Sequence, residues 1–255
     1  MAKPLGALSG WLNEDTWPRV LCPECLEGTL ALKSTTQYPD ARSRAHIELV
    51  RRHLDGPDEL GGSFTGVLEC DNHGCKREAA IAGDWAYLWS FDDVQERERL
   101  TDFFALRHIS PAPQLLLTPQ RTPTKVVEAI AMASSVLWTS PDLAATQLRL
   151  AVEELLTARG VKRTFITAKR KRKRLSAQER LDIFASTHPE VVHALEAVKW
   201  IGNTGTHESG LSIDDVVTGA KFLELALRRL YDTNEADLLA TAKDINRRRG
   251  LPRVR

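Results

Sequence analysis

From residue 92 onward, apolar residues recur every three or four positions, which is the spacing of amphipathic helices. This pattern predicts helices over 92–109, 124–140, 140–160, 176–186, 187–201, 212–232 and 234–249. Residues that favour helix starts support four of these boundaries: Ser140 before Pro141, and the capping boxes Ser176/Glu179, Thr187/Glu190 and Ser212/Asp215. The second half of the chain is therefore expected to be helical, with strands confined to the first third.

The first third carries a different pattern. Short apolar runs at 28–34 and 77–90 predict hairpin strands, and residues 40–56 between them have helical spacing. Residues 110–123 contain four prolines, which excludes a helix and predicts an extended linker along the surface. We therefore expect a β ribbon with a helical insert over 1–91, a helix and proline-rich linker over 92–122, and a helical domain over 123–255.

Four cysteines fall into two close pairs, "CPEC" and "CDNHGC", that is Cys22 with Cys25 and Cys70 with Cys75. Two such pairs separated by a long insert are typical of a zinc ribbon, in which two tight turns direct four thiolates at one Zn²⁺. A closed four-thiolate site would be structural, because it leaves no open position for chemistry. Two alternatives are four unrelated buried cysteines, and replacement of one cysteine ligand by His73 in the second turn.

Positive charge is concentrated in two places. The chain of 255 residues has a net charge of +1, yet 155–178 holds nine basic residues and no acidic one, and 247–255 holds five more. Removing these fourteen cations leaves −13 for the remainder. The densest run is Lys169, Arg170, Lys171, Arg172, Lys173 and Arg174, predicted to be a loop or irregular arm.

Such a run favours contact with the phosphates of RNA or DNA, and the nearby Phe165 could stack on a base. A solvated loop, or docking on an acidic surface of the chain or a partner, are the alternatives.

Other function classes find no support in the sequence. No segment approaches the ~20 apolar residues of a membrane span, and the N-terminal segment lacks the apolar core of a signal peptide. Motifs for nucleotide phosphates, metalloproteases and serine nucleophiles are absent. We therefore expect a cytoplasmic protein without membrane contact.

The segment "KWIGNTGTHESG" at 199–210 ends the helix predicted over 187–201. Gly202 is expected to stop that helix, and Asn203 and Gly205 to shape a turn toward the next one. His207 then either fixes the angle between the two helices or belongs to a site. Arg149 and Glu153, four residues apart on one predicted helix, form either an exposed ion pair or an inward-facing pair.

Four segments together, "ISPAPQLLLTP", "LRLAVEELL", "IGNTGTH" and "LRRLYD", resemble the family called domain of unknown function 4145. The resemblance covers Ile109 to Asp232, and a zinc ribbon is a common companion. That family is similar to the HEPN superfamily of helical bundles, found in prokaryotic defence, toxin and restriction systems. Several HEPN branches are metal-independent ribonucleases that act as dimers. The resemblance implies a mainly α fold, a HEPN-like bundle preceded by a small β zinc ribbon.

For function, the resemblance implies a defence- or restriction-associated protein acting on nucleic acid, with a homodimer or a defence-system protein as further partners. In a ribonuclease, His207 would be the general acid/base, Lys199 or Arg149 would hold phosphate, and Asn203 would orient the turn; Glu153 would face the same site. The sequence departs from the nuclease pattern, because Lys199 replaces arginine, seven residues separate it from His207, and its neighbour is Trp200. The alternative is a non-catalytic adaptor that binds nucleic acid or protein.

Overall fold

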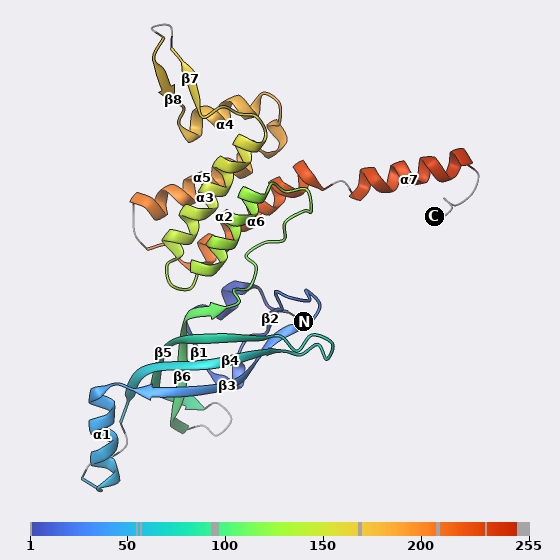
Figure 1. Cartoon of the computed structure of the whole chain (residues 1–255). Coiled ribbons are helices and arrows are strands. Elements are labelled where there is room, and N and C mark those ends of the chain that lie inside the picture. Colours follow the sequence, from blue (N-terminus) through green and yellow to red (C-terminus); the bar gives the residue numbers. More distant parts are fainter. Residues whose placement is uncertain are drawn as a thin grey trace.

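The computed structural model describes residues 2–54, 56, 58–92, 97–167, 170–207, 210–232 and 234–248. A β-sheet region and a helical region succeed one another along the chain (Figure 1). The sheet has six antiparallel strands in the order β1-β6-β5-β4-β3-β2. Their bounds are β1 Trp11–Leu12, β2 Val20–Leu21, β3 Thr29–Pro39, β4 Leu60–Cys70, β5 Glu78–Asp92 and β6 Arg97–Ser110.

This sheet corrects the expected fold class. A mainly α protein with a small ribbon is wrong, because a six-stranded antiparallel sheet forms the first region and its strand β5 alone spans 15 residues. The helix predicted over 92–109 is also wrong, since β6 occupies this stretch and pairs with β5 from Asp92 to Ala80. Leu100, Asp102, Phe104 and Leu106 alternate with residues on the opposite face, so a strand buries Phe104 and Leu106 together.

The core of the sheet lies on the face that carries Phe64 and Phe104, which are almost completely buried and pack edge to face at 4.9 Å. Trp85 is buried beside them, and its indole nitrogen donates a hydrogen bond of 2.6 Å to Asp102. The helix predicted in the insert is confirmed as α1 (Ala41–Arg51), where the Asp40 side chain caps the first turn. This helix lies at the end of the sheet remote from the bundle (Figure 1).

The helical region consists of α2 (Thr124–Val136), α3 (Pro141–Ala158), α4 (Ala177–Ala185), α5 (Pro189–His207), α6 (Ile213–Tyr231) and α7 (Asn234–Arg248). The first five pack together around α3, which contacts α2, α4, α5 and α6, and α7 extends away from them (Figure 1). The predicted cap at Ser140 and the capping boxes starting at Ser176 and Ser212 are confirmed. The capping box predicted at Thr187/Glu190 is wrong, because Thr187 donates to the Phe184 carbonyl and α5 begins only at Pro189.

The helix stop predicted at Gly202 is wrong, because α5 continues to His207. A Cβ atom on Gly202 would lie 2.5 Å from the Cβ of Arg149, and one on Gly205 would lie 2.6 Å from the Asp142 carbonyl oxygen. Both glycines therefore face α3 and let the two helices approach closely. The sequence alone suggested a helix end, because glycine is common just past the last turn of a helix. The close approach of α3 accounts for both glycines within α5.

The proline-rich segment connects sheet and bundle without a helix, as predicted. It is not a purely surface linker, because Leu115 and Leu116 are buried in the core. The backbone N–H of Leu115 donates to the Ser134 hydroxyl on α2 at 3.2 Å. Hydrogen bonding and burial thus make the linker part of the junction between the two regions.

Candidate functional site

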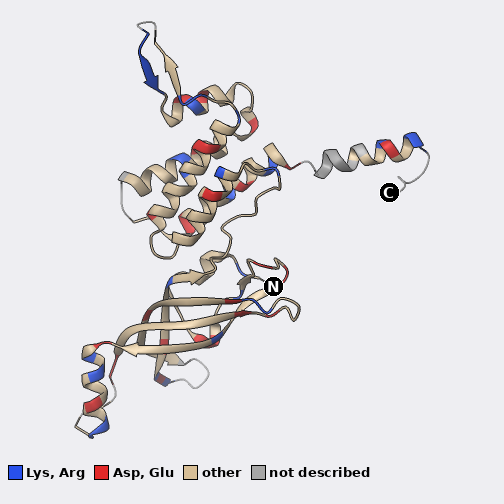
Figure 2. Ribbon diagram, in the orientation of Figure 1, with Lys and Arg blue, Asp and Glu red and all other residues tan. Residues whose placement is uncertain are grey.

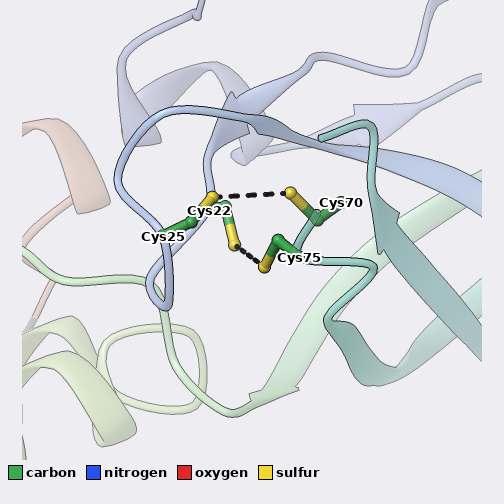
Figure 3. A group of neighbouring side chains, drawn as sticks. All are labelled: Cys22, Cys25, Cys70 and Cys75. Atoms are coloured by element: carbon green, nitrogen blue, oxygen red, sulfur yellow. Dashed lines mark hydrogen bonds between the residues drawn. The ribbon is translucent and has the colours of Figure 1, made fainter. Parts of the chain in front are cut away.

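The four cysteines converge at one end of the sheet. Cys22 and Cys25 belong to the turn between β2 and β3. Cys70 is the last residue of β4, and Cys75 belongs to the turn between β4 and β5. Because β3 and β4 are neighbours in the sheet, the two turns lie side by side (Figure 3). All four Sγ atoms lie within 4.8 Å of one another.

The sulfur spacing matches a tetrahedral thiolate centre. The Sγ atoms are 3.9 Å apart between Cys22 and Cys75, and 3.7 Å apart between Cys25 and Cys70. A tetrahedron with metal–sulfur bonds of about 2.3 Å has edges of about 3.8 Å. None of the four forms a disulfide. The cluster could therefore hold one metal ion.

Electrostatics and packing shape this cluster. Backbone N–H groups of Gly28 and Glu27 lower the pKa of the Cys25 thiol to about 6, whereas burial raises the pKa of Cys70 to about 12. A Cβ atom on Gly28 would lie 2.6 Å from the Cys70 sulfur. Because Cys22 and Cys70 are completely buried, the centre is closed toward solvent on one side. His73 is exposed in the second turn and is not part of the cluster, which does not favour it as a ligand.

The basic run lies in one arm of a hairpin, which corrects the expected loop. Strands β7 (Thr164–Ile166) and β8 (Arg172–Arg174) pair antiparallel, and the hairpin projects from the bundle beside α4 (Figure 1). The backbone N–H of Thr167 donates to the Lys171 carbonyl at 2.9 Å beyond the last strand pair. Lys169 lies outside the described residues. Figure 2 shows β8 as a continuous basic strand.

Acidic side chains of the bundle hold only the base of the hairpin. Arg163 pairs with Glu154 at 2.6 Å, and the longer pairs Lys173–Glu179 and Arg174–Glu153 measure 3.8 and 3.9 Å. Within the described part of the chain, Arg170, Lys171 and Arg172 form no ion pair. The outer half of the hairpin therefore presents uncompensated positive charge to solvent.

The residues considered for catalysis lie on α3 and α5. Lys199 is 3% exposed, donates to the Gln178 side chain, and has its ammonium 3.8 Å from the centre of the Trp200 ring. Burial holds the pKa of Lys199 below its usual range. A lysine so enclosed is occupied by protein groups and is not open to a phosphate.

Arg149 packs its stem against Gly202, and its Nε lies 3.8 Å from the Glu153 carboxylate. The pair is about three-quarters buried, so it is neither fully exposed nor fully inward. Asn203 lies within helix α5 and not in a turn. His207 is the last residue of that helix, and its side chain lies outside the described residues.

Sequence reasoning missed Arg180 on α4, which is only 2% exposed. Its guanidinium donates to the Thr157 hydroxyl at 2.7 Å and to the Val161 carbonyl at 3.1 Å. It therefore ties α4 to the end of α3, where the hairpin begins. The sequence did contain a signal for its burial. Arg180 precedes the buried Leu181 and lies four residues before Phe184, on the apolar face of α4.

A cleft beside the hairpin was also not foreseen. It has a volume of about 410 Å³ and lies between the end of α3, strand β7 and helix α4. Phe165 contributes to its wall.

None of the described helices combines the length and apolar character needed to cross a bilayer.

Comparison with known proteins supports part of the resemblance. A family described as "Domain of unknown function (DUF4145)" matches residues 131–248, a range that includes the hairpin and the α3–α5 contact but not the sheet. No curated protein and no solved structure matches the chain. The match supports the DUF4145 family for the helical region and does not extend to the cysteine cluster.

Proposed function

We propose that this protein binds nucleic acid through the β7–β8 hairpin without cleaving it, and that its four cysteines hold a structural Zn²⁺. The observation that carries the proposal is the exposed cationic strand. Cations displayed on a projecting strand attract a phosphate backbone, since each phosphate contact releases condensed counterions. Such contacts fix position on the strand without reading sequence.

The zinc assignment rests on ligand chemistry. Four soft thiolates at tetrahedral spacing favour Zn²⁺ over harder cations such as Mg²⁺ or Ca²⁺, which prefer oxygen ligands. Four protein ligands leave no position for a water or a substrate. The metal would therefore hold together the turns that follow β2 and β4, and would not take part in chemistry.

Binding is favoured over cleavage because the cations that a ribonuclease would use are already engaged by neighbouring protein groups. A ribonuclease needs a cation that can reach phosphate and a group that transfers protons. Lys199 is buried against Gln178, and Arg149 packs on Gly202 beside Glu153. These contacts hold neighbouring helices together and engage both cations with protein groups. A defence or restriction setting, and a homodimer, stay predictions of the resemblance.

The direct experiment measures binding of fluorescein-labelled RNA and DNA strands by anisotropy. Arg170→Glu/Arg172→Glu should weaken binding at ~100 mM salt by at least about tenfold, because two attractive contacts become repulsive. The matched control is Arg42→Glu/Arg51→Glu, which makes the same charge change on exposed α1 and should bind like the wild type. Equal loss in both variants would mean that net charge, and not the hairpin, drives binding.

Cleavage is tested with the same RNA in EDTA. The proposal expects intact RNA with both the wild type and His207→Ala. Ends carrying 2′,3′-cyclic phosphate from the wild type alone would instead establish the ribonuclease.

A further inference from the structure

The cleft at the base of the hairpin is lined by apolar and cationic residues and by the hydroxyl-bearing Thr164, Ser186 and Thr187. Val161, Leu175, Ile183, Phe184 and Phe165 supply apolar surface, and Arg159 and Lys162 supply positive charge. None of the described residues that line it carries a carboxylate. Its volume of about 410 Å³ lies within the range of small-ligand sites, roughly 300–1,000 Å³.

Phe165 lies between the cleft and the cationic strand. It pairs directly with Lys173 in the hairpin, and the Lys173 ammonium lies 5.7 Å from the centre of its ring. The ring is 39% exposed, a large value for an aromatic side chain that lines a cleft. The next residue, Ile166, points to the opposite face of the hairpin, is 74% exposed and does not line the cleft.

An occupant of this cleft must be flat and apolar in one part and negatively charged in the adjoining part. A nucleotide unit has this chemistry, because its base stacks on aromatic rings and its phosphate pairs with cations. We infer that the cleft takes one unpaired base of a single-stranded nucleic acid, stacked on Phe165, while the adjoining phosphate lies against Lys173, the β8 cation on the same face of the hairpin. This inference rests on the proposed function and adds its substrate class.

Selectivity for single strands follows from this arrangement. In a duplex each base is paired and stacked, and bringing one out costs a few kcal/mol. The hairpin cations would still attract duplex phosphates, but the cleft would stay without a base. Wild-type protein should therefore bind a single strand more tightly than a duplex of equal length.

The test uses the full chain and anisotropy with labelled oligouridine of about 12 nucleotides and an RNA duplex of the same length. Phe165→Ala should weaken single-strand binding by about 5- to 100-fold and leave duplex binding unchanged. Phe165→Trp should retain single-strand affinity, because indole also stacks. Ile166→Ala is the matched control on the same strand and should bind like the wild type. Melting curves confirm that each variant is folded.

The outcomes separate the two proposals. If the wild type binds neither probe, the proposed function fails. If the wild type binds both and Phe165→Ala changes single-strand and duplex binding equally, or not at all, the proposed function stands and the base-stacking inference is overturned. An equal loss with Ile166→Ala would also overturn it, because that side chain does not line the cleft.

Discussion

The cysteine cluster and the basic hairpin are both built on antiparallel strands that bring like groups together, but they do so in opposite directions. The four thiols converge, with every sulfur within 4.8 Å of the others and two of the cysteines fully buried. The cations of β8 diverge from a projecting strand into solvent (Figure 2). Convergent donors suit one small ion, whereas a line of cations suits an extended polyanion. Geometry, more than residue type alone, thus favours a metal site for the cysteines and a binding surface for the hairpin.

The largest effect should come from removing the metal. We expect one Zn²⁺ per chain by elemental analysis, and a fall in melting temperature of more than about 10 °C on chelation, because structural zinc sites contribute folding energy directly. Cys70→Ser should reproduce the loss, since Cys70 is a buried member of the cluster at the end of β4. Return of Zn²⁺ should restore the wild type but not the variant.

A protein that carries no metal and melts identically with and without chelator would contradict the convergent half of the comparison. The cysteines would then be four buried thiols that merely pack together.

A single methyl group sharpens the comparison further. Gly28→Ala places a Cβ 2.6 Å from the Cys70 sulfur and 2.7 Å from the Asn72 Cβ, so the two turns must separate. We expect a loss of about 1–3 kcal/mol in unfolding free energy, together with weaker metal retention. Thermal or denaturant unfolding with a zinc-release assay measures both.

Gly74→Ala is the matched control in the second turn, where the nearest atom to the added carbon is the Asn72 side-chain oxygen at 3.5 Å. It should change stability by no more than about 0.5 kcal/mol. Equal costs at Gly28 and Gly74 would show that the turns are not tightly opposed.

The smallest effect concerns the base of the hairpin. Hydrogen bonds from Ser176, first of all its backbone N–H, hold the pKa of Glu179 below its usual range, with help from Lys173. A lowered carboxyl pKa stabilises the fold above the unfolded value of 4.5, and this contribution is lost as pH falls through the folded pKa. Glu179→Gln should therefore remove a small part of the stability difference between neutral pH and about pH 4.

Unfolding curves over that pH range test this expectation, with Glu128→Gln, an exposed carboxylate on α2, as the control. If both variants keep the pH dependence of the wild type, Glu179 does not anchor α4 beside the hairpin.

The cysteine cluster could be predicted because its signal is local. Two close pairs of cysteines indicate the ligand set, and the pairing of β3 with β4 brings the two pairs together. The helix starts at Ser140, Ser176 and Ser212 are local signals too, and all three are confirmed. Strand β6 was not predicted, since its residues fit a helical period until the pairing with β5 selects the alternating face.

Long-range contacts explain the other differences. Gly202 indicated a helix end, and only the approach of α3 shows that it makes room for Arg149. Six consecutive cations indicated an irregular arm, since repulsion opposes order. The structure orders β8 by pairing it with β7, and places Lys173 near Phe165 and Glu179.

The central claim is that the hairpin carries the contact with nucleic acid, and the salt dependence of binding tests it most directly. Binding of a labelled single strand would be measured from about 50 to 200 mM salt. Five described cations, Arg170 to Arg174, predict a slope of about −3.5 for the logarithm of the association constant against the logarithm of salt concentration. In Arg170→Glu/Arg172→Glu, three cations remain and the slope should shrink to about −2. A slope near zero, or the same slope in both proteins, would contradict the account.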